Sequence, residues 1–150
     1  ARREALYGVI TARAVAWSVA FATAEEIDGI DILNARMLAM NRAIDGLGVR
    51  PDLCLIDGNR AHGSLVSIAA PHITIVGGDG RSASVAAASI LAKVSRDRYV
   101  SGELDRLYPQ YGFAGHKGYG TKLHYEMLDR YGPCPAHRRT FLKKWEARQR

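Results

Sequence analysis

The chain has 150 residues, of which 47% are hydrophobic and 24% are charged. This balance is ordinary for a folded globular domain and excludes a disordered or low-complexity protein. The net charge of +6 and the isoelectric point near 9.6 favour a polyanionic partner such as a nucleic acid, although many basic proteins bind no polyanion.

The same features predict a cytoplasmic protein. The longest uncharged run, residues 65–78, is interrupted by polar side chains and is too short to cross a bilayer. No basic stretch followed by an apolar run opens the chain, so we expect no secretory signal. Cys54 and Cys134 could pair, but two thiols do not make a disulfide framework, and Cys54 is expected to be a small core residue.

The first part of the chain predicts a helix, a strand and a second helix. Residues 2–12 are expected to be the end of a helix without a preceding cap, which indicates a fragment or a processed chain. Residues 14–24 alternate large apolar with small side chains, which is the period of a strand, and residues 25–28 break that pattern. Asp31 is expected to cap a helix that runs to about Leu47.

The remaining elements complete a mixed α/β pattern. Two apolar runs, 53–59 and 72–79, predict strands buried on both faces. A helix is expected from Ser82 to about Leu107, with small residues that would let it approach a sheet. A Gly-rich aromatic loop at 108–120, a helix at 121–131, a break at 132–135 and a basic helix at 138–148 follow. We expect one domain over residues 1–150, with a helical C-terminal part from about 121 to 150.

Asp57 and Asp79 are the strongest chemical signal. Each stands at the C-terminal end of a predicted strand and is followed by glycine. Ligands of open α/β sheets bind at that edge, and carboxylate oxygens suit Mg²⁺ or Mn²⁺. The alternative is that both are turn residues, because Asp-Gly is a common turn dipeptide.

The loop at residues 111–121 is the second signal. It interleaves Tyr and Phe with glycines and one Lys, a pattern that can place a ring on a sugar or base and a charge on a phosphate. The alternative is a surface loop whose rings pack into the core. We interpret the charge cluster at residues 95–98 as a solvated helix face, and the basic segment from His137 to Arg150 as either phosphate-contacting or solvated.

Other chemistries find little support. No Cys or His pair has the spacing of a zinc site, and no Ser, Cys or His stands in a nucleophile motif. The glycines at residues 77–80 precede a helix but lack the Lys and Ser or Thr of a phosphate-binding loop and the spacing of a dinucleotide fingerprint.

Taken together, several segments resemble bacterial ribonuclease HII, and they cover essentially the whole chain. They are Met37-Leu38-Ala39-Met40 with Ala43, Leu55-Ile56-Asp57-Gly58-Asn59, Gly78-Asp79 with residues 84–94, Arg96-Asp97, residues 108–113, His116-Lys117-Gly118-Tyr119-Gly120-Thr121, and His137-Arg138-Arg139-Thr140-Phe141. The resemblance implies a ribonuclease H-like mixed sheet with flanking helices.

The resemblance also implies an activity and its residues. The family cuts the RNA strand of RNA–DNA hybrids, or incises on the 5′ side of ribonucleotides embedded in duplex DNA. Four carboxylates there hold two Mn²⁺ or Mg²⁺ ions. Asp57 and Asp79 match the third and fourth carboxylates, and Tyr119 matches the tyrosine that packs on the sugar at the RNA–DNA junction. Further substrate contacts are expected from neighbouring positions, namely His116, Lys117, Gly118 and Arg138.

The resemblance has one large gap. The family's first strand carries adjacent Asp and Glu followed by Gly-Arg-Gly, and residues 1–150 contain no such pattern. We therefore expect a fold without its N-terminal strands and without two metal ligands, since Glu25, Glu26 and Asp28 lie outside the matching positions. Two hypotheses follow: a monomeric metal-dependent endonuclease with a part in ribonucleotide excision repair, or a non-catalytic basic fragment that binds nucleic acid.

Overall fold

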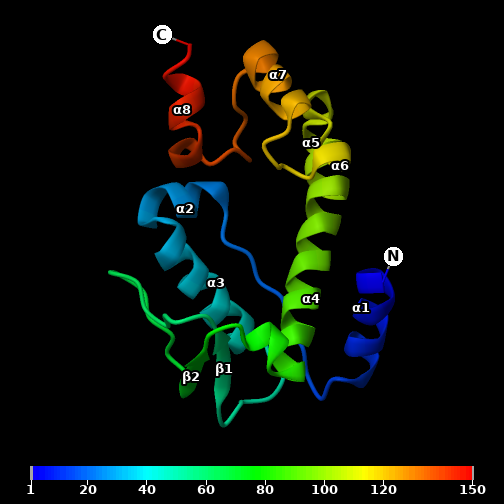
Figure 1. Ribbon diagram of the computed structural model, residues 1–150, viewed down its shortest axis with the longest axis vertical. Coiled ribbons are helices and arrows are strands. Elements are labelled where there is room, and N and C mark those ends of the chain that lie inside the picture. The colour runs from blue at the N-terminus through cyan, green and yellow to red at the C-terminus, as the bar shows by residue number, and fades with distance from the viewer. Residues whose placement is uncertain (1, 150) are drawn as a thin grey trace. The chain divides into compact units, whose positions relative to one another are not determined.

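The computed structural model describes residues 2–149, and the chain divides into two compact units, Ala1–Val94 and Ser95–Arg150. The division falls inside one long helix, α4 (Ala83–Tyr99) (Figure 1). The single domain that the sequence predicts stays a prediction. Within residues 2–149, no helix combines the length and apolar character needed to cross a membrane.

The first unit combines helices with a small parallel sheet, which confirms the predicted α/β class. In chain order its elements are α1 (Arg2–Arg13), α2 (Ala24–Ile30), α3 (Ile32–Asp45), β1 (Cys54–Asp57), β2 (His72–Ile75), the 3-10 turn η1 (Gly78–Gly80) and the beginning of α4. Met37, Ile56, Ala61 and Ile68 form its buried core. Cys54 packs against this core half-buried, and Cys54 and Cys134 are both free thiols.

The predicted strand at residues 14–24 is wrong. The alternation of side chains is present, but a strand also needs a neighbour that pairs with its backbone, and the described sheet consists of β1 and β2. The segment instead runs beside α3, where the Phe21 carbonyl accepts a hydrogen bond of 3.0 Å from Arg42 Nη1. Residues 25–28 do not break a regular element but belong to α2, because Thr23 and Glu26 form a capping box at its start.

The predicted start of the next helix is confirmed. Asp31 is the N-cap of α3, and its Oδ1 accepts hydrogen bonds from the amides of Leu33 (2.8 Å) and Asn34 (3.0 Å). Asp31 has a φ of 69°, a region that Asp tolerates better than most residues. These bonds hold the pKa of its carboxyl below the usual range, mainly through the Asn34 amide.

Strands β1 and β2 lie where the two apolar runs predict them, but they are not buried on both faces. They pair in parallel, with Asp57 opposite Ile75. Ile56 packs into the core, whereas Leu55 is 36% exposed and Ile73 is 49% exposed. The core beside α3 covers one side of the sheet, and apolar residues on the strands' other positions stay in contact with solvent in the part of the chain that the structure describes.

The second unit consists of helices and helical turns. After α4 follow a π-helical turn η2 (Val100–Leu104), α5 (Asp105–Leu107), the 3-10 turn η3 (Pro109–Tyr111), α6 (Phe113–His116), α7 (Lys122–Tyr131), the 3-10 turn η4 (Arg139–Phe141) and α8 (Lys143–Glu146). The long helix ending near Leu107 and the helix at 121–131 are thus confirmed. The predicted loop at 108–120 contains η3 and α6, and the predicted basic helix is two short pieces.

Aromatic residues build the core of this second unit. Tyr111 and Phe113 are buried and stack with ring centroids 5.5 Å apart, and Leu128 and Trp145 join the same cluster. The Tyr111 hydroxyl donates a hydrogen bond of 2.5 Å to the Gly132 carbonyl. Trp145 Nε1 donates to Asp129 Oδ1 at 2.6 Å. Burial of these rings explains why α6 and α8 form even though each is only one turn long.

Asn34 connects α3 to the loop after β1. Its side chain is fully buried. Its Nδ2 donates to Ser64 Oγ (3.1 Å) as well as to groups at the start of its own helix, and its Oδ1 accepts from the amides of Leu65 (2.8 Å) and Val66 (2.9 Å). One amide group therefore satisfies polar groups of two segments about thirty residues apart in the chain.

We expect Asn34→Ala to lower the free energy of unfolding by about 2–3 kcal/mol, because it leaves the amides of Leu65 and Val66 without their partner. Urea unfolding followed by circular dichroism measures the change. Asn41→Ala is the matched control: Asn41 also bonds the following segment (Ser67 carbonyl 2.8 Å, Ala69 amide 3.1 Å) but where water can replace it. Equal losses for the two variants would contradict the role assigned to burial.

Candidate nucleic-acid and metal site

The two aspartates predicted as metal ligands lie on neighbouring segments of the first unit. Asp57 ends β1, and Asp79 lies in η1 directly after β2. Because β1 and β2 are parallel, their carboxyl ends meet at the same edge of the sheet. Asp57 Oδ1 accepts a hydrogen bond of 2.8 Å from the amide of Gly78, the residue immediately before Asp79. Both side chains are exposed.

Glycines shape the turn that carries Asp79. Gly77 has a φ of 63°, which other residues rarely adopt. Gly78 is buried, and a Cβ there would lie 3.2 Å from Val85 Cγ1 and 3.3 Å from Asp57 Oδ1. The absence of a side chain at Gly78 therefore lets the turn approach both α4 and the carboxylate of Asp57. Asp79 and Gly80 thus lie in a turn, whereas Asp57 is the last residue of β1, and the two segments present two carboxylates.

The donor set fits part of a divalent cation's coordination shell. Carboxylate oxygens suit Mg²⁺ and Mn²⁺, which also keep water ligands. Within residues 2–149, however, no group of three or more His, Cys, Asp or Glu side chains is arranged to hold a metal ion. Asp57 and Asp79 are too few to hold two ions, which need several oxygen ligands around them.

The Gly-rich loop of the second unit presents Tyr119. Lys117 and Gly118 both have positive φ, 51° and 75°, so the chain turns sharply between α6 and Tyr119. Tyr119 is 53% exposed, and Arg96 Cζ lies 5.1 Å from the centroid of its ring. A Cβ on Gly118 would lie 3.4 Å from Arg96 Nη2. The guanidinium thus supports one side of the ring by a cation–π contact and packs against the turn.

The sequence suggested that the charge cluster at residues 95–98 is a solvated helix face. The structure corrects this, because Arg96 and Asp97 contact a distant loop. Asp97 is only 19% exposed, and its carboxylate lies 3.5 Å from Lys117 Nζ and 3.4 Å from Arg96 Nη1. Arg96 and Asp97 together hold the segment that carries Lys117 and Tyr119. Sequence reasoning missed this role because helix periodicity does not show which distant loop a charged side chain meets. Arg96 and Asp97 belong to the segments that resemble a known family, and this was the one sign in the sequence that they have a specific role.

Three buried histidines lie behind this loop. His116 Nε2 contacts the Tyr111 carbonyl at 2.8 Å, and its Nδ1 accepts from the Gly118 amide at 3.1 Å. His124 Nδ1 lies 3.0 Å from the Tyr119 carbonyl, and its Nε2 lies 2.9 Å from His137 Nε2. Substrate contact by His116 stays a prediction; in the structure both of its ring nitrogens have partners within the unit.

Burial lowers the pKa of two of these histidines. Burial is the main cause for His137, whose pKa falls to about 4, and the neighbouring His124 adds to it. Burial likewise lowers the pKa of His124, although the Tyr119 carbonyl opposes the shift. Burial also raises the pKa of the Cys134 thiol. At neutral pH this cluster therefore carries no charge on His124 or His137.

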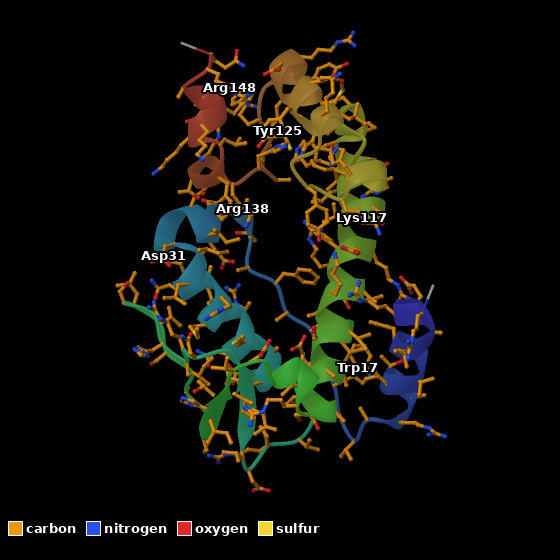
Figure 2. The ribbon with its side chains drawn as sticks, viewed as in Figure 1. Trp17, Asp31, Lys117, Tyr125, Arg138 and Arg148 are labelled. Atoms are coloured by element: carbon orange, nitrogen blue, oxygen red, sulfur yellow. The ribbon has the colours of Figure 1, made fainter. Side chains whose placement is uncertain are left out.

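The C-terminal segment supplies basic and aromatic side chains. Arg138 Cζ lies 3.8 Å from the centre of the Phe141 ring, and Phe141 is 55% exposed. Arg148 Cζ lies 5.4 Å from the ring of Tyr125 on α7, and Figure 2 shows both side chains. Lys143 and Lys144 are exposed on α8. Positive charge beside exposed rings is a surface suited to a sugar–phosphate backbone.

Stability of the second unit should fall as the pH falls from about 6.5 to about 4. The unfolded chain protonates His137 near its ordinary pKa of 6.5, whereas the folded chain does so only near 4. The stabilisation is thus complete above pH 6.5 and is lost on acidification, with an upper limit of about 3 kcal/mol. Thermal unfolding monitored by Trp145 fluorescence in a Trp17→Phe background between pH 7.5 and 4 measures it. His137→Asn should flatten this pH dependence, and replacing the exposed His62 by Asn should not.

Comparison with known proteins identifies the family and supports the fold. The family model described as ribonuclease HII matches residues 2–146. The crystal structure of ribonuclease H2 from Pyrococcus horikoshii OT3 is similar at 25% sequence identity with a TM-score of 0.74, over 98% of this chain and 76% of that chain. Ribonucleases of this type hydrolyse the RNA strand of RNA–DNA hybrids and use divalent metal ions. The chain belongs to the ribonuclease HII family.

Proposed function

We propose that this protein incises duplex DNA on the 5′ side of an embedded ribonucleotide and cuts the RNA strand of RNA–DNA hybrids, leaving a 3′-hydroxyl and a 5′-phosphate. One observation carries the proposal: in a chain of the ribonuclease HII family, Asp57 and Asp79 stand at adjacent parallel strand ends and are linked through Gly78. The loop around Tyr119 and the basic C-terminal segment support a nucleic-acid substrate.

Asp57 and Asp79 are proposed as two of the carboxylates that hold divalent ions, Mn²⁺ or Mg²⁺. Such ions activate water and stabilise the leaving oxygen. The hydrogen bond from the Gly78 amide fixes the direction of the Asp57 carboxylate, so that it is held in place before a cation arrives. Within residues 2–149, no third metal-binding side chain is arranged with this pair to hold an ion, so a two-ion site needs further ligands.

Tyr119 is proposed to pack on the sugar at the RNA–DNA junction. Its exposed ring, supported by Arg96, offers an apolar face that lies in a positively charged surrounding. A ring in contact with the sugar can sense the 2′-hydroxyl, the group that distinguishes RNA from DNA. Lys117 and Arg138 are proposed to contact phosphates, and the Gly118 backbone, which has no side chain, allows close approach.

We expect Asp57→Asn to abolish cleavage in the natural protein while leaving the fold nearly intact. The substituted amide oxygen can still accept from Gly78, but the negative charge that binds a cation is lost. The measurements are incision of a duplex with one ribonucleotide in Mn²⁺ and the thermal unfolding midpoint. Asp52→Asn is the matched control, because Asp52 is an exposed acid that precedes the first residue of β1. Near-normal activity of Asp57→Asn would show that Asp57 is only a turn residue.

Tyr119→Ala is expected to weaken discrimination between ribonucleotide-containing and all-DNA duplexes. Aromatic stacking on a base is worth about 1–3 kcal/mol, which corresponds to about 5-fold to 150-fold, and a sugar contact should be at or below this range. The ratio of cleavage or binding on the two duplexes measures the effect. Tyr119→Phe keeps the ring and should retain most of the discrimination. An unchanged ratio in Tyr119→Ala would remove this residue from the site.

A second candidate function is favoured by the small donor set. Two carboxylates alone bind Mg²⁺ weakly, so residues 1–150 by themselves should bind nucleic acid without cutting it. Binding should weaken steeply with salt, because the contacts come from exposed lysines and arginines. The purified chain is incubated with a ribonucleotide-containing duplex and Mn²⁺, and incision and binding are measured at two salt concentrations. Specific 5′ incision by residues 1–150 would mean that other acids complete the site.

A further inference from the structure

A continuous hydrogen-bonded chain connects the C-terminal segment with the backbone of Tyr119. The Cys134 amide donates to His137 Nδ1 at 3.0 Å, His137 Nε2 lies 2.9 Å from His124 Nε2, and His124 Nδ1 lies 3.0 Å from the Tyr119 carbonyl. His124 and His137 are buried, at 7% and 8% exposure. Water therefore cannot easily replace a lost partner in this chain.

The partners determine which ring nitrogen carries each proton. A carbonyl oxygen only accepts, so His124 Nδ1 must donate to Tyr119. In neutral His124 the other nitrogen, Nε2, then accepts, and His137 Nε2 must donate to it. His137 Nδ1 is left as the acceptor for the Cys134 amide, which is a donor. Each of the three contacts thus has one donor and one acceptor. The lowered pKa of both rings is consistent with this neutral arrangement.

His116 holds the same loop from its other end. Its Nε2 must donate to the Tyr111 carbonyl, which leaves Nδ1 to accept from the Gly118 amide. Its ring stacks on His124, with centroids 4.3 Å apart and an angle of 15° between the planes. The Gly118 amide, which precedes Tyr119, and the Tyr119 carbonyl are thus each bonded to an imidazole with only one permitted tautomer.

We infer that His124 and His137 are positioning residues that set the backbone of Tyr119 and thereby the direction in which its ring meets the substrate. This inference rests on the proposed contact between Tyr119 and the sugar. His124 acts directly on the Tyr119 carbonyl. His137 acts through His124 by supplying the proton that fixes the tautomer of His124, and the Cys134 amide fixes His137 in turn.

The first test reads the tautomers without any activity. Long-range nitrogen–proton correlation spectra of the ¹⁵N-histidine-labelled chain at pH 7.5 should show the Nδ1–H form for His124 and the Nε2–H form for His116 and His137. Assignment uses single His→Gln variants. An Nε2–H form of His124, or exchange between both forms, would overturn the relay whether or not Tyr119 touches a substrate.

The second test uses variants of the natural, cleaving protein. His124→Asn keeps a side-chain N–H near the Nδ1 position, whereas His124→Leu has no donor. We expect His124→Leu to lower kcat on a ribonucleotide-containing duplex at least tenfold with little change in KM, and His124→Asn to recover most of this loss. Thermal midpoints are recorded for both. Equal loss of activity in the two variants, in proportion to their loss of stability, would mean that His124 only stabilises the core.

The double variant Tyr119→Ala/His124→Leu separates this inference from the proposed function. If His124 acts through Tyr119, the double variant should be no slower than Tyr119→Ala alone. Losses that multiply would overturn the inference, because His124 would then act independently of Tyr119. If Tyr119→Ala has no effect by itself, the proposed sugar contact fails, while the tautomer measurement still decides whether the relay exists.

Discussion

The hydrogen bond between the Gly78 amide and the Asp57 carboxylate is the constraint on which the candidate metal site depends. It joins the ends of β1 and β2, the only strands in the part of the chain that the structure describes. Without a Cβ, Gly78 can come close enough to donate, and Asp79 follows in the next position. Parallel pairing brings the strand ends to one edge, and this bond then sets the direction of a carboxylate that would otherwise rotate in solvent.

In the second unit, too, contacts from other segments fix the direction of an exposed side chain, here the ring of Tyr119. The loop at residues 117–119 begins with positive φ angles at Lys117 and Gly118, of which only the one at Lys117 is unusual for its residue type. Asp97 and Arg96 support this loop on the charged side, and neutral imidazoles support it on the buried side. The result is an exposed Tyr119 ring on a backbone with few alternative conformations, which reduces the entropy that substrate binding would have to remove.

Members of the ribonuclease HII family use divalent ions and act on RNA–DNA hybrids. Both units therefore carry residues of interest for one activity. Residues 2–149 hold two carboxylates at the strand ends and a tyrosine-bearing loop with basic neighbours. The same residues do not assemble a site for two ions. Binding of nucleic acid and cleavage are therefore proposed separately, and each can be measured without the other.

Local signals in the sequence were sufficient for much of this molecule. The Asp31 cap, the helical periodicity that follows it, the apolar runs of β1 and β2 and the motif around Tyr119 depend on neighbours in the chain, so both strands, most of the helices and the family could be named from residues alone. Tertiary structure decided the rest. Residues 14–24 have the alternation of a strand without a strand to pair with, Leu55 and Ile73 are exposed despite their apolar runs, and Arg96, His124 and His137 gain their roles from partners that only folding brings within hydrogen-bond distance or ring contact. A side chain's type is written in the sequence, but its protonation, burial and direction depend on which distant groups surround it.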